Sequence, residues 1–118
     1  MTVNNTQLTN GRVFWITGLA GAGKTTTAEE LTRRCRQQGR VVIFLDGDNL
    51  RQIFGNDLGH SQEDRHKGAW RNANICKAIS AQGIDVICAT ISMFHDVRQA
   101  NRDTIPAYIE IYLKVDLE

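Results

Sequence analysis

The sequence predicts an α/β fold in which a mostly parallel sheet of about four strands carries helices on both faces. Three observations support this prediction. Apolar runs alternate with stretches of helical periodicity along the chain. The first three runs are almost continuously apolar, as is typical of parallel strands covered on both faces. A glycine-rich segment follows the first run directly, where a strand would pass into a helix.

The apolar runs predict four strands, over Val13–Thr17, Val41–Leu45, Val86–Ile91 and Tyr108–Val115. The fourth run differs from the others because apolar and polar residues alternate along it, so we expect this strand to be exposed on one face. An uncovered edge strand can pair with a strand of another chain, so the sequence predicts a possible homodimer.

Two helices are expected between these strands. The first follows the glycine-rich segment and ends at Gly39, a residue type common just past a helix C-terminus. The second begins at Ser61, whose hydroxyl fits a capping box with Asp64 three residues later, and it ends near Gly83.

Length and composition favour one domain over residues 1–118, with a flexible polar N-terminus over residues 1–11. The 118 residues are 42% hydrophobic, and 14 basic against 13 acidic residues give a net charge of +1. That balance provides no basic surface for nucleic acid. Three widely spaced cysteines are typical of a reducing compartment, and no apolar run reaches the roughly 18 residues of a membrane span. We therefore expect a cytoplasmic protein without membrane contact.

The glycine-rich segment GLAGAGKTT matches the phosphate-binding loop, or Walker A motif, G-x-x-x-x-G-K-[ST]. Such a loop points backbone N–H groups and a helix N-terminus at phosphate oxygens, which predicts a P-loop NTPase-type fold and ATP binding. The glycine pattern is not the G-x-G-x-x-G of dinucleotide-binding folds. The expected ATP-binding residues are Gly18, Leu19, Ala20, Gly21, Ala22, Gly23, Lys24, Thr25 and Thr26.

Within this loop, Lys24 is expected to bring positive charge to the β and γ phosphates. The Thr25 hydroxyl is expected to bind Mg²⁺, the cofactor that accompanies ATP. A turn without a ligand is the alternative, and it would require both the preceding strand and the following helix to be accidental.

A second group of polar residues follows the second predicted strand, where Asp46, Asp48 and Arg51 lie at the carboxyl end of the sheet. Two carboxylates beside a phosphate loop could hold Mg²⁺ or accept a proton from a hydroxyl group. Helix capping and turn formation explain the same residues equally well, and spacing alone leaves both interpretations open.

From about Gly11 onward, the chain resembles the adenylylsulfate kinase family. The resemblance is carried by four motifs in order, GLAGAGKTT, LDGDNLR, DLGHSQEDR and ATIS. It implies phosphoryl transfer from ATP to the 3'-hydroxyl of adenosine 5'-phosphosulfate, a step of sulfate assimilation. Positioning and charge neutralisation are most of what such a transfer needs.

By this resemblance, Asp46 would lie near the metal and Asp48 near the attacking hydroxyl, with Asp48 as the first choice of general base. Arg51 and Arg65 would bind the acceptor's phosphosulfate. Ser92 matches a serine regarded in the family as a phosphoserine intermediate. Direct transfer needs no such intermediate, and a serine that bonds to the backbone is the alternative.

The remaining acceptor-side residues implied by the resemblance are Ile91, which would line the pocket, and His60, which stands where the family usually has phenylalanine. Further departures lie nearby. Gly68 and Trp70 occupy positions where the family usually has asparagine and arginine, and Met93 replaces a proline. The ATP side of the pattern is intact.

These departures leave two alternatives to an adenylylsulfate kinase. One is a related kinase with another small nucleotide-like acceptor, such as cytidine diphosphoramidate in surface-polysaccharide synthesis. The other alternative is a truncated protein that binds nucleotide and catalyses little. It rests on the expectation that the chain stops before the arginine-bearing lid of the family.

Overall fold

Four parallel strands form the central sheet, in the order β2-β3-β1-β4. The structure is a computed structural model that describes residues 10–19 and 22–114. The strands are β1 (Val13–Gly18), β2 (Val42–Asp46), β3 (Asp85–Thr90) and β4 (Tyr108–Leu113). The predicted parallel α/β architecture is therefore confirmed.

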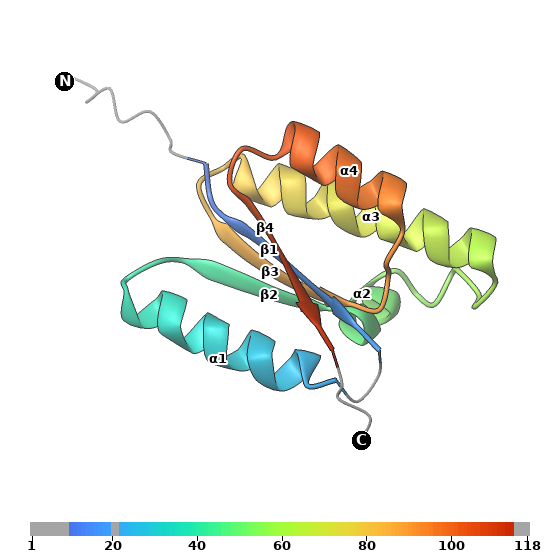
Figure 1. The fold of residues 1–118 in the computed structure, drawn as a ribbon, viewed down its shortest axis with the longest axis horizontal. Helices are drawn as coiled ribbons and strands as arrows, with labels where there is room; N and C mark the ends of the chain where they lie inside the picture. Colours follow the sequence, from blue (N-terminus) through green and yellow to red (C-terminus); the bar gives the residue numbers. More distant parts are fainter. Residues whose placement is uncertain (1–9, 20–21, 115–118) are drawn as a thin grey trace.

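Helices cover both faces of this sheet (Figure 1). Helix α1 (Lys24–Gln37) packs on one face, and α3 (Gln62–Ser80) and α4 (His95–Thr104) pack on the other. The short helix α2 (Gly47–Ile53) follows β2 directly. The result is three layers, with each βαβ crossover placing a helix against the parallel sheet.

The sequence did not predict α2 and α4 as helices. Helix α2 has only seven residues and begins in the LDGDN segment, whose Asp, Gly and Asn residues also favour turns. Helix α4 follows Phe94 without a side-chain cap, so the usual signal for a helix start is missing from its sequence.

Helix α3 begins where its cap predicts, but only half of the expected capping box forms. The Ser61 hydroxyl accepts a hydrogen bond from the backbone N of Asp64 at 3.1 Å. The Asp64 carboxylate accepts from the backbone N of Gly59 at 2.8 Å instead of reaching back to Ser61. Asp64 thereby fixes the loop that precedes the helix.

The edge strand β4 does not show the simple alternation that its sequence predicts. Ile109 is 39% exposed and Tyr112 is 57% exposed, although they belong to opposite faces. Helix α4 explains the burial of polar residues here, because the Tyr108 hydroxyl accepts from Asn101 at 3.3 Å and Glu110 pairs with Arg102. Pairing of β4 with a second chain stays a prediction.

The two faces of the sheet carry separate apolar clusters because successive strand residues point to opposite sides. Trp15 and Cys88 are fully buried under α3 and α4, whereas Ile16 and Ile87 are fully buried under α1. All three cysteines are buried thiols without a disulfide. Within the described ranges, no helix is long and apolar enough to cross a bilayer.

Residue Gly11 departs from the expectation of a flexible segment over residues 1–11. It is buried, and its backbone N donates to the Ser80 carbonyl at 2.7 Å. A Cβ atom at this position would lie 2.0 Å from the Ile84 carbonyl oxygen, so only glycine fits. Residues 1–9 lie outside the described part of the chain.

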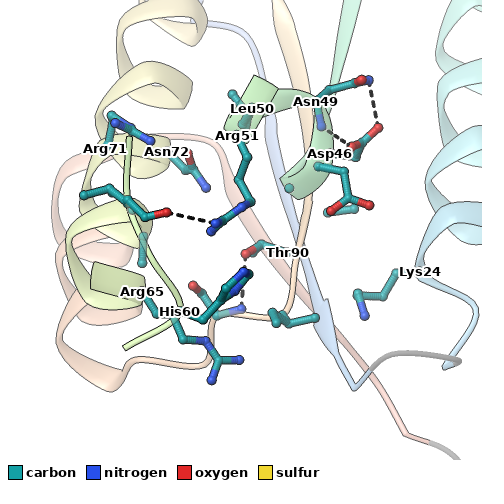
Figure 2. Close-up of a pocket in the computed structure, with 18 of the residues that line it drawn as sticks. Lys24, Asp46, Asn49, Leu50, Arg51, His60, Arg65, Arg71, Asn72 and Thr90 are labelled. Atoms are coloured by element: carbon teal, nitrogen blue, oxygen red, sulfur yellow. Dashed lines mark hydrogen bonds between the residues drawn. The ribbon is translucent and has the colours of Figure 1, made fainter. Parts of the chain in front are cut away.

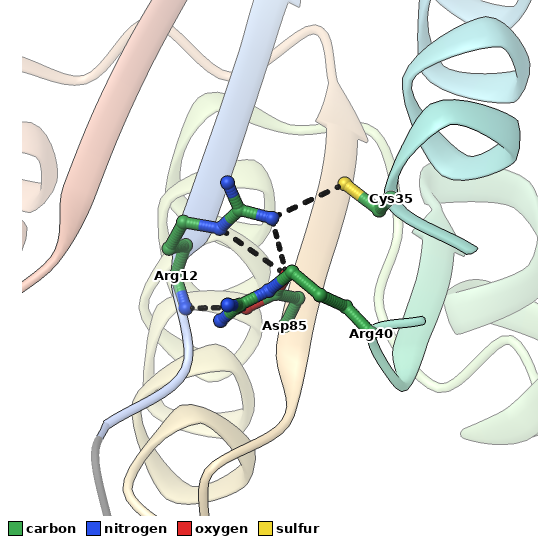
Figure 3. A network of polar contacts seen from close by, with 4 residues as sticks. All are labelled: Arg12, Cys35, Arg40 and Asp85. Atoms are coloured by element: carbon green, nitrogen blue, oxygen red, sulfur yellow. Dashed lines mark hydrogen bonds and ion pairs between the residues drawn. The ribbon is translucent and has the colours of Figure 1, made fainter. Parts of the chain in front are cut away.

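At the amino end of the sheet, the buried carboxylate of Asp85 joins three separate segments (Figure 3). Arg12 donates to it from its backbone N at 2.8 Å and from its guanidinium, and Arg40 donates a second pair of side-chain bonds. One Arg12 Nη also lies 3.6 Å from the Cys35 sulfur. Asp85 thus ties the start of β1 and the loop before β2 to the start of β3.

The two arginines decide the charge state of Asp85. Burial by itself disfavours the carboxylate, but hydrogen bonds from Arg40 and Arg12 outweigh that effect and hold the pKa of Asp85 well below its ordinary value. Asp85 is therefore ionised throughout the physiological range. A carboxyl with a lowered folded-state pKa stabilises the fold above its unfolded pKa and loses this effect as the pH falls.

We predict that Asp85→Asn lowers the free energy of unfolding by about 2 kcal/mol at pH 7. This is less than the cost of breaking a fully buried pair, because Arg12 and Arg40 are 31% and 40% exposed and stay in contact with water. Urea unfolding would measure the change. The difference from wild type should persist down to about pH 4 and shrink at lower pH.

The exposed Glu30–Arg33 pair on α1 provides the matched control, since a surface ion pair contributes little. Glu30→Gln should leave the urea midpoint unchanged. An Asp85→Asn midpoint equal to that of wild type at pH 7 would show that the cluster does not stabilise the fold.

Candidate active site

The strand register brings the carboxyl ends of β1, β2 and β3 to one edge of the sheet. Ile16 and Asp46 both pair with Ala89, so the residues that follow each strand emerge at the same level. A cavity of about 920 Å³ lies beyond this edge. It is bounded by the start of α1, by α2, by α3 and by the segment after β3, the usual ligand position in open α/β sheets.

The phosphate loop connects β1 to α1 at one side of this cavity. Gly18 has φ of +154°, and a Cβ atom there would lie 2.6 Å from the Leu113 carbonyl oxygen. Gly23 precedes α1 with φ of +87°, a conformation that other residues rarely adopt. Two of the predicted loop residues, Ala20 and Gly21, lie outside the described residues.

Lys24 in this structure turns back onto its own loop. Its Nζ donates to the carbonyls of Gly18 at 2.8 Å and Leu19 at 3.0 Å. Burial disfavours the charged form and lowers the pKa of Lys24 from its ordinary value. No acidic residue occupies the first turn of α1, so the positive end of the helix dipole and Lys24 act together on this side of the cavity.

The carboxylate of Asp46 caps α2, which was one of the two interpretations of its sequence position. Its Oδ1 accepts from the Asn49 backbone N at 2.7 Å, and its Oδ2 accepts from the Asn49 side chain at 2.9 Å. Asp48 lies in the first turn of the same helix and is exposed. Both carboxylates line the cavity, so capping does not remove them from the site.

The predicted acceptor residues lie across the cavity from Lys24 (Figure 2). Arg51 on α2 donates to the Leu58 carbonyl at 2.9 Å, which fixes the guanidinium against the loop before α3. His60, near the end of that loop, and Arg65, in the first turn of α3, are exposed and line the cavity. The structure thus brings together residues 14 positions apart in the chain.

The segment after β3 forms another part of the cavity wall. Ile91 and Ser92 both line it, and Ile91 is 48% exposed. The backbone N of Ser92 donates to the Thr90 hydroxyl at 3.1 Å, which fixes the turn out of the strand. A phosphorylated Ser92 stays a prediction.

Several residues that line the cavity were not predicted as site residues. Arg71 on α3 donates from its Nη1 to both carboxylate oxygens of Asp57, and its guanidinium carbon lies 3.7 Å from the centre of the Phe54 ring. The other unpredicted lining residues include Asn56, Leu58 and Asn72. The sequence offered one indication of Asn72. It follows Arg65 by seven residues, about two helical turns, which places both on the same face of a helix.

Gly68 and Trp70, the two residues of α3 that depart from the family pattern, lie on different sides of the helix. Gly68 lines the cavity. Trp70 points to the other side of the helix, where it packs against the apolar core and lines an outer groove with Phe54. Of the two interpretations of Trp70, packing is therefore the one that the structure shows.

Comparison with known proteins identifies the family. The sequence profile of adenylylsulphate kinase matches residues 10–118. The chain belongs to the adenylylsulphate kinase family. An adenylyl-sulfate kinase of Halothermothrix orenii is 41% identical over 108 residues, with 92% of this chain and 58% of that relative covered. A cytidine diphosphoramidate kinase of Campylobacter jejuni is 38% identical, with 92% and 63% covered.

Solved structures of this family have the same fold. The Mycobacterium tuberculosis APS kinase CysC in complex with AMPPNP and APS superimposes with a TM-score of 0.82 at 30% identity, covering 92% of this chain and 65% of that one. The chain spans between about half and two thirds of the length of these relatives.

Oxygen ligands for Mg²⁺ are present but few. The described residues contain no group of three or more His, Cys, Asp or Glu side chains able to hold a metal by themselves. Magnesium in nucleotide sites usually takes one or two protein ligands and completes its shell with phosphates and water. The Thr25 hydroxyl and the Asp46 carboxylate, both lining the cavity, fit that smaller requirement.

We predict that Gly18→Ala lowers the free energy of unfolding by about 3 kcal/mol, because the new methyl group meets the Leu113 carbonyl and the backbone conformation also becomes strained. Gly39→Ala is the matched control. Gly39 has φ of +77° but nothing within 4 Å of its Cβ position, so it should lose only about 1 kcal/mol. Equal losses in urea unfolding would contradict the steric contribution at Gly18.

Proposed function

We propose that this chain binds Mg-ATP and transfers its γ-phosphoryl group to the 3'-hydroxyl of adenosine 5'-phosphosulfate. The observation that carries this proposal is the shared cavity. The phosphate loop with Lys24 lies on one side, and Arg51 and Arg65 lie on the other. Family membership and the similarity to a solved complex with AMPPNP and APS support the same assignment.

The donor half of the reaction uses the loop and the start of α1. Phosphate oxygens would take the place of the Gly18 and Leu19 carbonyls as partners of Lys24. An anion in this position favours the charged form of the ammonium group and accepts hydrogen bonds from N–H groups at the start of the helix. Mg²⁺, held by Thr25 and Asp46, would neutralise further phosphate charge.

The acceptor half uses the charge pattern of the opposite wall. Arg51 and Arg65 would bind the anionic end of the acceptor. Asp48 is exposed in the first turn of α2 and lines the cavity, which suits a general base for the 3'-hydroxyl. The new bond joins the 3' oxygen to the γ phosphorus, the bond to ADP breaks, and the hydroxyl proton passes to Asp48.

A second acceptor, cytidine diphosphoramidate, has its own support. The C. jejuni relative named for that activity is 38% identical to this chain. In addition, Gly68 lines the cavity at a position where the adenylylsulfate kinase pattern has asparagine, so one side chain of that pattern is missing from the acceptor wall. Both proposals need the same donor half.

We predict that Lys24→Ala weakens Mg-ATP binding at least ten-fold, because the loss removes a charge-assisted contact to phosphate. Isothermal titration calorimetry would measure the affinity. Lys67→Ala on the outer surface of α3 is the matched control, since its only described ion pair is with exposed Glu63. Unchanged affinity in the folded Lys24→Ala protein would contradict the loop assignment.

We predict that Arg65→Ala weakens binding of adenosine 5'-phosphosulfate ten- to a hundred-fold while Mg-ATP affinity is retained. Arg36→Ala, an exposed arginine on the last turn of α1, should change neither affinity. ADP release from Mg-ATP, with each compound in turn as the sole acceptor, would then assign the reaction. Turnover with cytidine diphosphoramidate and none with adenosine 5'-phosphosulfate would establish the second acceptor in place of the first.

A further inference from the structure

The loop between α2 and α3 sets the position of one cavity arginine. Arg51 lies in the last turn of α2, and its Nη2 donates to the carbonyl of Leu58 in that loop at 2.9 Å (Figure 2). A guanidinium has five N–H donors, so this bond orients Arg51 and leaves other donors for an anion. The direction in which Arg51 presents them therefore depends on where the loop holds the Leu58 carbonyl.

This loop has no regular secondary structure and is held by side chains of α3 on both sides of Leu58. After Leu58, the backbone N of Gly59 donates to Oδ2 of Asp64 at 2.8 Å. Before Leu58, the carboxylate of Asp57 accepts from Nη1 of Arg71 at 2.8 and 3.1 Å. The second contact is an ion pair, and its hydrogen bonds hold the pKa of Asp57 below the ordinary value. Asp57 is therefore ionised at neutral pH and stays paired with Arg71.

Arg71 is itself fixed by the residue that follows α2. Its guanidinium carbon lies 3.7 Å from the centre of the Phe54 ring. Phe54 packs against the apolar core, so its ring is held in place from behind. Stacking combined with a directed hydrogen bond suits the planar guanidinium of arginine, and the ammonium group of lysine cannot reproduce both. Arg71 thus connects α3, the end of α2 and the loop between them.

The partners of Arg71 and Arg51 suit the two arginines to different roles. Arg71 lines both the cavity and the outer groove, its charge is paired with Asp57, and its side chain is only 25% exposed. Arg51 is bonded to a neutral carbonyl, so its positive charge remains available to a ligand. Arg51 is therefore the arginine that meets an anion, and Arg71 supports the loop that orients it.

We propose that Arg71 positions Arg51 for acceptor binding by holding the loop between α2 and α3. This inference rests on the proposed function, in which Arg51 binds the anionic end of the acceptor. Arg71 is a positioning residue, because it acts through Asp57 and does not itself contact the acceptor. Without Arg71 the loop loses one of its two anchors and Arg51 takes up several orientations, so acceptor affinity falls. The phosphate loop lies across the cavity and is not affected.

A double-mutant cycle tests whether Arg71 acts through Arg51. Calorimetry would measure binding of adenosine 5'-phosphosulfate to wild type, Arg71→Met, Arg51→Met and the double variant, with Mg²⁺ and AMPPNP saturating the donor side. Each single variant should bind the acceptor at least ten-fold more weakly than wild type. In the Arg51→Met background, Arg71→Met should cause no further loss, because the group that it positions is already absent. Affinity for Mg-AMPPNP should be the same in all four proteins.

Arg102 on α4 provides the matched control. It forms an ion pair with Glu110 in which the two side chains are 44% and 22% exposed, a burial similar to that of the Arg71–Asp57 pair. Among the described residues, the cavity lining includes neither Arg102 nor Glu110. Arg102→Met should therefore bind the acceptor as wild type does. Arg71→Lys is a second test variant, and it should lose about as much acceptor affinity as Arg71→Met because it keeps the charge without the planar group.

The outcomes separate this inference from the proposed function. If folded Arg71→Met binds the acceptor as wild type does, or if its loss is equally large in the Arg51→Met background, Arg71 does not act through Arg51 and the kinase proposal stands. A ten-fold loss of Mg-AMPPNP affinity in Arg71→Met would show a general structural effect and also overturn the inference. If wild type binds Mg-AMPPNP but no adenosine 5'-phosphosulfate, the acceptor assignment and this inference both fail. Circular dichroism at the titration temperature would establish that every variant is folded.

Discussion

The parallel arrangement of β1, β2 and β3 is the constraint on which the rest of the structure depends. Because these strands run in the same direction and in register, their carboxyl ends lie at one edge of the sheet. Each strand is followed by a segment that contains candidate site residues. These segments are the phosphate loop, the start of α2, and the Ile91–Ser92 segment. A single cavity arises from residues separated by more than 60 positions in the chain.

The charged residues that stabilise the fold and those proposed to bind a ligand lie at opposite ends of this sheet. At the amino end, Arg12 and Arg40 both form ion pairs with the buried carboxylate of Asp85. At the carboxyl end, Lys24 donates to two backbone carbonyls, and Asp48 and Arg65 form no ion pair within the part of the chain that the structure describes. Charges that are satisfied internally hold the strands together, whereas charges that lack strong partners are those that a charged ligand can bind.

Two arginines of the acceptor wall are held in place by neighbouring groups. Arg51 is fixed by a backbone carbonyl, and Arg71 is held by both Asp57 and Phe54. These contacts connect α2, α3 and the loop between them. Gly68, Arg65 and Asn72 line the same wall from α3.

The sequence by itself determined the parallel sheet, the phosphate loop and the approximate positions of α1 and α3, because these depend on local apolar patterns and on a motif with fixed spacing. It left the role of Asp46 open, gave no sign of α4, and did not indicate Arg71 or Asn72 as cavity residues. Only the tertiary structure shows that Asp46 caps α2, that α4 is a helix, and that Arg71 and Asn72 line the cavity. Which side of α3 meets the cavity and which meets the outer groove depends on packing against β3 and α2, and no local pattern encodes those contacts.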